Sequence, residues 1–218
     1  MHRNILVTAV VLALLVAPAL APLQPVAADD DQLADIIAAI NTDELYRYDK
    51  TIQDVGPHPT GSDECRQVAS FIYSEFESYG LNVTYHAWQH NSLSGDNVVA
   101  TLPGKTNYTV IISAHYDTVE DSPGADDDGS GVSSVLMAAQ ILSSYSFQHT
   151  VKFICYSGEE QGLYGSGAYA QNAYQQRENI LAVLQLDGVG HAVSREGGST
   201  IRLCANDASI WLTDAAQQ

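Results

Sequence analysis

Positive charge is scarce in this sequence. Only 9 of the 218 residues are Lys or Arg, whereas 26 are Asp or Glu, so the formal net charge at pH 7 is −17. Nucleic acids and anionic membrane surfaces attract basic proteins and repel acidic ones. We therefore expect neither nucleic acid nor a membrane surface among the partners of this protein.

Cysteine is also rare. Cys65, Cys155 and Cys204 are the only three, an odd number with no spacing typical of a metal site. Disulfides are therefore not expected to be the main scaffold of the fold. Cys155 lies inside an apolar strand pattern, so we expect it to be a buried thiol.

Long hydrophobic runs are confined to the N-terminus. Residues 5–20 form a mainly apolar run that Pro18 interrupts and that is short for a membrane span. Small residues follow, just before three aspartates. This order is typical of a secretory signal peptide, so we predict a signal peptide over residues 1–28 and a secreted, extracellular protein. Residues 29–218 then form one domain, for which the 45% hydrophobic content supplies one sizeable core.

Helix and strand patterns alternate along the predicted domain. Apolar residues at helical spacing predict helices, and short apolar runs rich in β-branched residues predict strands. Such alternation is typical of an α/β fold, here a mixed, mostly parallel sheet sandwiched by helices. Helices are predicted over residues 32–48, 63–79, 131–144 and 164–177, with the start of another at 211–218, and strands over 82–89, 97–102, 108–114, 151–157, 180–186 and 199–204.

The stretch over residues 110–131 carries the strongest chemical pattern. It begins as an apolar run, typical of a strand buried on both faces, and stops at His115, with Asp117 two residues later. Residues i and i+2 of an extended chain point the same way, so His115 can offer one ring nitrogen to a metal while Asp117 steers the other. Three aspartates at 126–128 then precede a glycine-rich turn into a helix. Like charges this close are costly unless a cation lies among them, so the stretch predicts a metal site.

Two other predicted strands also end in carboxylates. Glu159 and Glu160 follow one of them, and Asp187 follows the other. Each acid alone could be an ordinary loop or turn residue. In open α/β sheets, however, the ligand crevice lies outside the carboxyl ends of the strands. Together with His115, these acids therefore predict one metal-binding, catalytic edge of the sheet.

Four sequence motifs follow one another along this part of the chain. They are A-H-Y-D at 114–117, P-G-A-D-D-D-G-S-G at 123–131, S-G-E-E-Q-G-L-Y-G-S at 157–166 and L-D-G at 186–188. In this order they resemble the M28 family of zinc metallopeptidases, which includes the bacterial leucyl-type aminopeptidases, and the match to the family's order runs from about Val55 to Asp187. The resemblance implies a zinc-dependent exopeptidase fold of the phosphorylase/hydrolase-like type.

The resemblance also implies a centre of two zinc ions. Asp127 would bridge the two ions together with a water molecule. His115 and Asp187 would complete the ligands of one zinc, and Glu160 would bind the other. Asp127 is preferred to Asp126 as the bridge because it is the first aspartate of the element D-D-G-S-G, where the family places that ligand.

Two further acids have roles that the resemblance implies. Glu159 resembles the general base, which would take a proton from the bridging water and pass it to the leaving amine. Asp117 resembles the acid that fixes the tautomer of His115. The peptide bond before Asp128 is cis in relatives, and we expect the same here.

The sequence departs from the family's pattern in one respect. The family's final histidine ligand, and a tyrosine that helps to hold the oxyanion, lie well beyond the position that matches Asp187. This chain ends at Gln218, before either of them. His191 is not where the family places its ligand, so we expect it to belong to a loop. We therefore expect a chain that is truncated before the last metal ligand and a sheet that is incomplete at its C-terminus. The sequence does not determine whether this chain by itself is active.

The sequence thus favours an exported di-zinc exopeptidase that acts as an aminopeptidase on peptide substrates. Two alternatives on the same fold stay open: a single-zinc, glutaminyl cyclase-like acyltransferase, and a non-catalytic binding ectodomain. Asp128 favours the peptidase, because cyclase relatives replace that aspartate, and the presence of every ligand expected in this region argues against the ectodomain. Carboxypeptidase or dipeptidase specificity, the preferred side chain and the oligomeric state stay undetermined.

Overall fold

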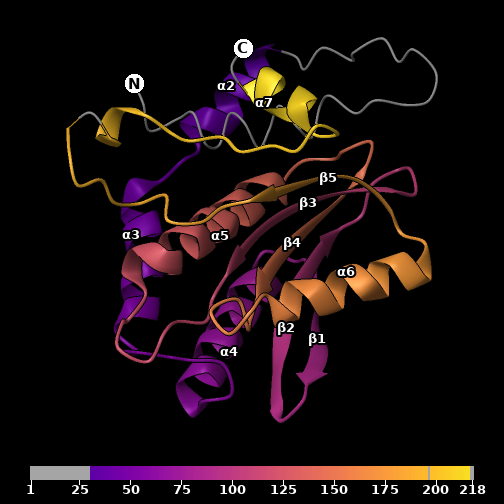
Figure 1. Ribbon diagram of the computed structural model, residues 1–218. Coiled ribbons are helices and arrows are strands. Elements are labelled where there is room, and N and C mark those ends of the chain that lie inside the picture. Colours follow the sequence, from indigo (N-terminus) through magenta and orange to yellow (C-terminus); the bar gives the residue numbers. More distant parts are fainter. Residues whose placement is uncertain (1–29, 196, 217–218) are drawn as a thin grey trace.

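The computed structural model describes residues 30–195 and 197–216 (Figure 1). The signal peptide predicted over residues 1–28 lies outside the described residues. Within the described part of the chain, no helix has both the length and the apolar character that crossing a membrane requires.

Five strands form one mixed sheet in the order β1-β2-β4-β3-β5. β3 is parallel to both of its neighbours, whereas β2 is antiparallel to both of its own. β2 therefore runs against the other four strands, which confirms the predicted mixed, mostly parallel sheet. The strands are β1 (Asn82–His90), β2 (Leu93–Leu102), β3 (Tyr108–His115), β4 (Thr150–Tyr156) and β5 (Asn179–Gln185).

Helices cover both faces of the sheet (Figure 1). α4 and α5 pack on one face, with α3 against the outer side of α5, and α6 packs on the opposite face. This arrangement confirms the expected layers of an α/β fold. The helices are α2 (Asp30–Ala38), α3 (Thr42–Gln53), α4 (Asp63–Ser78), α5 (Gly131–Leu142), α6 (Tyr164–Gln176) and α7 (Ile210–Ala216), with a π-helix η2 (Ala125–Ser130) and a 3₁₀ turn η3 (Gly197–Ser199).

The single helix predicted over residues 32–48 is wrong, because two helices, α2 and α3, occupy this region. Asn41 is the cause of the break. Its backbone is extended, and its side-chain oxygen accepts hydrogen bonds from the backbone N–H groups of Asp43 and Glu44. Such an N-cap satisfies donors that a helix leaves free at its start, so a new helix begins at Thr42.

The strand predicted over residues 199–204 is also wrong. Ser199 ends the 3₁₀ turn η3, and residues 200–204 have no regular structure and are exposed. Among the described residues, the sheet ends at β5 and no strand pairs with this segment. Without a partner, its alternating apolar residues do not form a strand. The helix predicted to start near residue 211 is present as α7.

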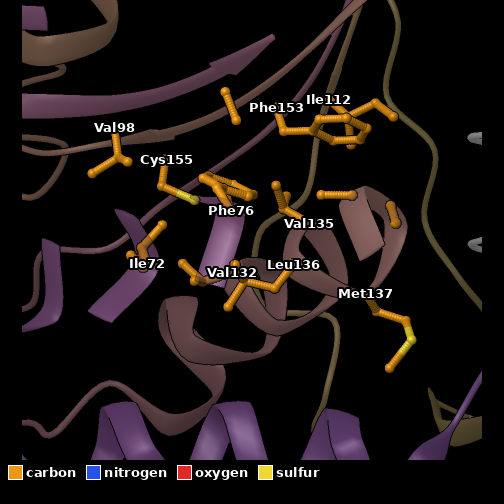
Figure 2. Packing of buried hydrophobic residues seen from close by; sticks show 14 of the residues in the cluster. Ile72, Phe76, Val98, Ile112, Val132, Val135, Leu136, Met137, Phe153 and Cys155 are labelled. Carbon is orange, nitrogen blue, oxygen red and sulfur yellow. The ribbon is translucent and has the colours of Figure 1, made fainter. Parts of the chain in front are cut away.

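The larger core lies between the sheet and helices α4 and α5 (Figure 2). Phe76 of α4 faces Phe153 of β4, with ring centroids 6.3 Å apart. Cys155 is fully buried in the same cluster, as predicted. Successive side chains of a strand point to opposite faces, so Ile112 of β3 joins this core while Ile111 packs in a smaller one beneath α6. The central strands are thus buried on both faces, which fixes the positions of their ends.

Candidate metal centre

Three neighbouring strands end at the same edge of the sheet. In the parallel pairing of β3 with β4, His115 lies opposite Tyr156, and β3 also pairs in parallel with β5. Glu159 and Asp187 follow the ends of β4 and β5 within three residues. The strand register therefore brings the predicted histidine and carboxylates to one place.

His115 is buried at the end of β3, with 1% of its side chain exposed. Its Nε2 atom lies 3.1 Å from Oδ1 of Asp127 and 4.0 Å from Oε2 of Glu159. Its Nδ1 atom lies 3.1 Å from the backbone oxygen of Asp117 and 3.8 Å from the carboxylate of the same residue. Nε2 is thus directed at the acidic cluster while Asp117 holds the other ring nitrogen, the orientation that a metal-binding histidine requires.

A possible metal site is formed by His115, Glu159 and Asp187, whose ligand atoms all lie within 4.8 Å of one another. Asp127 adjoins this group through its contact with His115, and 65% of its side chain is exposed. One imidazole nitrogen and several carboxylate oxygens are donors that zinc accepts in proteins. The side chains at this edge of the sheet therefore fit a zinc site.

Glu160 is not one of the three residues that gather within this distance. Its pKa is nevertheless raised, first by burial and then by the negative charge of Asp127, so it belongs to the same acidic cluster. The structure thus groups Glu159, and not Glu160, with His115 and Asp187. The division of roles between Glu159 as base and Glu160 as ligand stays a prediction.

The acidic side chains at this edge of the sheet shift the pKa values of their neighbours. Burial raises the pKa of Glu159, and the charges of Asp117 and Asp187 raise it further, against the effect of His115. Burial alone would lower the pKa of His115, but the acids around it, Asp117 foremost, raise it to about 10. Several carboxylates thus surround one imidazole, an arrangement that a divalent cation would stabilise.

Asp117 is completely buried and links two strand ends. Its Oδ1 accepts a hydrogen bond from the backbone N–H of Glu159 over 3.1 Å, and its Oδ2 accepts one from that of Glu160 over 3.2 Å. The resemblance implied only a contact with His115. In the structure, the same carboxylate also holds the segment that carries both glutamates.

Asp128 is buried and has a structural role that the sequence did not indicate. Its carboxylate accepts hydrogen bonds from the backbone N–H groups of His115, Gly131 and Gly188, over 3.0, 3.0 and 3.3 Å. Burial raises its pKa to about 8. Asp128 therefore joins the ends of β3 and β5 to the start of α5. His115 and Gly188 lie 13 and 60 residues away in the chain, so no local pattern could have identified these two contacts.

The other two aspartates of the triplet point to different places. Asp126 accepts hydrogen bonds from the backbone N–H groups of Gly190 and His191, over 2.8 and 2.9 Å, which places His191 in a loop as expected. Asp127 is the one whose carboxylate lies beside His115. The peptide bond between Asp127 and Asp128 is cis, as expected. We expected the negative charges of the three aspartates to need a cation. Instead, the carboxylates of Asp126 and Asp128 accept hydrogen bonds from backbone N–H groups.

Comparisons with known proteins relate this part of the chain to a peptidase family. The sequence profile of peptidase family M28 matches residues 97–200, which include every predicted metal ligand. The chain is 40% identical over 118 residues to leucine aminopeptidase 1 of Neurospora crassa, a match that covers 48% of this chain and 28% of that protein. It is 37% identical over 153 residues to leucine aminopeptidase 1 of Ajellomyces capsulatus, covering 60% and 38%. The chain thus matches well under half the length of these relatives.

Solved structures agree with the sequence comparison. The chain superimposes on the aminopeptidase LapA of Legionella pneumophila with a TM-score of 0.68 and 27% identity, covering 75% of this chain and 47% of that one. The zinc aminopeptidase BSAP of Bacillus subtilis has the same fold, with a TM-score of 0.63 at 15% identity and coverage of 68% and 69%. The sequence profile, the leucine aminopeptidase relatives and the shared fold lead to one conclusion: over residues 97–200 the chain is related to peptidase family M28, and it is related to the leucine aminopeptidases.

Proposed function

We propose that the protein is an exported di-zinc aminopeptidase that removes N-terminal residues from peptides. The observation that carries this proposal is that two predicted ligands, His115 and Asp187, meet the predicted base, Glu159, at three strand ends, with one donor atom of each within 4.8 Å of the others. The match to the M28 profile supports zinc-dependent peptidase chemistry, and the leucine aminopeptidase relatives support the aminopeptidase class. The apolar run over residues 5–20 supports export.

Four side chains would hold the zinc ions: His115, Asp127, Glu160 and Asp187. When bound, zinc supplies Lewis-acid chemistry, which acidifies water and polarises the carbonyl of a peptide bond. The protein's own contribution is to hold these donors before substrate arrives. Asp128 holds His115 in place by accepting a hydrogen bond from the backbone N–H of His115. Asp117 holds Glu160 by accepting one from the backbone N–H of Glu160.

Glu159 is the general base of the proposed reaction. About a third of its side chain is exposed, at 30%, so its carboxylate can reach both water and substrate. It takes a proton from the attacking water and later donates this proton to the leaving amine. Its raised pKa favours this exchange, because a base whose pKa lies closer to neutrality both accepts and returns a proton readily.

A Glu159→Gln variant tests this assignment. We expect kcat for a leucyl peptide to fall by about 100- to 10,000-fold, because the amide cannot accept the proton, while the zinc content stays that of the wild type. Glu120→Gln is the matched control, since Glu120 is an exposed acid in the turn after β3, and it should retain activity. Full hydrolysis by Glu159→Gln would refute the base assignment. Cyclisation of a glutaminyl peptide, with no release of amino acids, would indicate an acyltransferase instead.

A further inference from the structure

We propose that Thr60 is a positioning residue for the general base, acting through the backbone next to Glu159. This inference rests on the proposed function. It concerns a residue that lies nearly 100 positions before Glu159 in the chain and that belongs to a turn-rich loop over residues 56–62.

The segment that carries the two glutamates is held by its backbone. Four consecutive N–H groups, from Ser157 to Glu160, each donate a hydrogen bond to a side-chain oxygen of another segment. The acceptors come from strand β2, from the loop over residues 56–62 and from the segment after β3, so the whole segment is fixed from outside. The bonds are Ser157 to Asn97 Oδ1 (3.2 Å), Gly158 to Thr60 Oγ1 (2.8 Å), Glu159 to Asp117 Oδ1 (3.1 Å) and Glu160 to Asp117 Oδ2 (3.2 Å).

The bond from Gly158 to Thr60 is the shortest of the four and directly precedes Glu159. Thr60 is buried, with 8% of its surface exposed. A buried N–H group that loses its acceptor is costly, so the chain around it shifts to find another partner. Loss of the Thr60 hydroxyl would therefore displace the backbone one residue before the base.

Gly158 has little freedom to adjust in any other way. Its φ is +75°, a conformation that glycine adopts readily and other residues rarely adopt. A Cβ atom at this position would lie 2.5 Å from Cζ2 of Trp88. The indole of Trp88 also donates a hydrogen bond to Oγ of Ser157 over 2.9 Å. With Trp88 on one side, the contact with Thr60 fixes where the backbone leads into Glu159.

The same loop also binds the segment that follows His115. The backbone N–H of His58 donates to Oγ1 of Thr118 over 2.8 Å, and the N–H of Thr118 donates to the backbone oxygen of His58 over 3.4 Å. One loop therefore contacts the segments after both β3 and β4. It sets the separation between the base, Glu159, and the predicted ligand, His115, and Thr60 makes its contact on the side of the base.

Substitutions at Thr60 separate this role from a general contribution to folding. Thr60→Val keeps the shape of the side chain and removes the hydroxyl, whereas Thr60→Ser keeps the hydroxyl. Thr60→Ala is a second variant without a hydroxyl, so the comparison does not depend on how valine fits. Thr109→Val is the matched control, since Thr109 is also buried but lies at the far end of β3.

We expect Thr60→Val and Thr60→Ala to lower kcat by roughly 10- to 100-fold with little change in KM or zinc content, as when an outer partner of a site residue is lost. Thr60→Ser and Thr109→Val should remain within about threefold of the wild type. Equal kcat values for Thr60→Val and Thr109→Val would overturn the proposal, as would a Thr60→Ser variant as slow as Thr60→Val. A purely structural role would reduce stability without separating kcat from KM.

Amide hydrogen exchange gives a second measurement that does not depend on hydrolysis. The N–H groups of Gly158 and Glu159 should exchange faster in Thr60→Val than in Thr109→Val, with the strands of the sheet equally protected in both. If the wild type hydrolyses no peptide, the proposed function fails, whereas the contact with Thr60 is still tested by this exchange. Equal protection of residues 157–160 in the two variants would overturn the positioning role of Thr60.

Discussion

The backbone N–H of His115 donates a hydrogen bond to the carboxylate of Asp128 over 3.0 Å. The same carboxylate accepts the N–H of Gly188, directly after Asp187. One buried acid therefore holds the segments that carry two of the predicted ligands. Asp128 is not itself a predicted ligand, and both of its oxygens accept hydrogen bonds from backbone N–H groups. The arrangement of the metal centre thus depends on residues outside the predicted ligand set.

Replacement of Asp128 by Asn should weaken both the fold and the site. An amide has one acceptor oxygen where the carboxylate has two, so at least one buried N–H group loses its partner, at a cost of about 1–3 kcal/mol in the free energy of unfolding. Zinc affinity should fall as well, because His115 and Asp187 lose their common anchor. Urea unfolding and zinc titration measure the two effects.

Asp121→Asn is the control for this prediction, since Asp121 is an exposed acid in the turn after β3. The control should leave the free energy of unfolding and the zinc affinity unchanged. If Asp128→Asn behaved like Asp121→Asn in both measurements, the anchoring role of Asp128 would be wrong.

Replacement of Asp117 by Asn should lower activity by roughly 10- to 100-fold. The two oxygens of Asp117 accept the N–H groups of Glu159 and Glu160, and an NH₂ group in place of one oxygen would face a donor instead of accepting from it. The base, the adjacent glutamate or both would then move. The measurements are kcat and zinc affinity, with Asp121→Asn again as control. Wild-type values of both in Asp117→Asn would contradict this role.

The sequence predicted those elements whose residues carry a local pattern. The strands β3 and β4 are apolar because both of their faces are buried, so their positions and the candidate ligands at their ends could be predicted. The break between α2 and α3 was missed, because the apolar spacing continues through Asn41 and hides its capping role. The strand order, with β4 between β2 and β3, is set by pairing between distant segments, for which the chain gives no local pattern.

In the candidate site, too, residues that lie in a local sequence pattern could be predicted, whereas contacts between distant segments could not. His115 and Asp187 could be predicted because they directly follow strand patterns. The long-range partners of Asp117, Asp128 and Thr60 could not, because these side chains bind backbone groups far away in the chain: Glu159 lies 42 residues from Asp117, Gly188 lies 60 from Asp128 and Gly158 lies 98 from Thr60. Backbone donors are present at every position except proline, so the sequence does not distinguish the ones that are used.

The stability of the fold should decrease at alkaline pH through one buried tyrosine, Tyr48, and one partly buried tyrosine, Tyr79. The hydroxyl groups of Tyr48 and Tyr79 lie 2.7 Å apart, between α3 and the end of α4. Burial is the main cause that raises the pKa of both above the value of about 10 in an unfolded chain. The folded state thus holds these protons more tightly, so their contribution to stability is present below about pH 10 and is lost as the pH rises further.

Urea unfolding measured from about pH 8 to pH 11 checks this expectation. A variant with both Tyr48→Phe and Tyr79→Phe should lose less stability over this range than the wild type, because phenylalanine has no proton to lose. An equal alkaline loss in the two proteins would assign the effect to the net charge of −17 instead.

The zinc-to-protein ratio of the protein, expressed from its full gene, purified and dialysed, tests the central claim most directly. The account predicts a ratio of two. It also predicts that Asp127→Asn lowers the ratio, whereas Asp126→Asn does not, since only the carboxylate of Asp127 lies beside His115. A ratio near one would favour a site like that of the glutaminyl cyclases, and a ratio near zero would contradict a zinc peptidase.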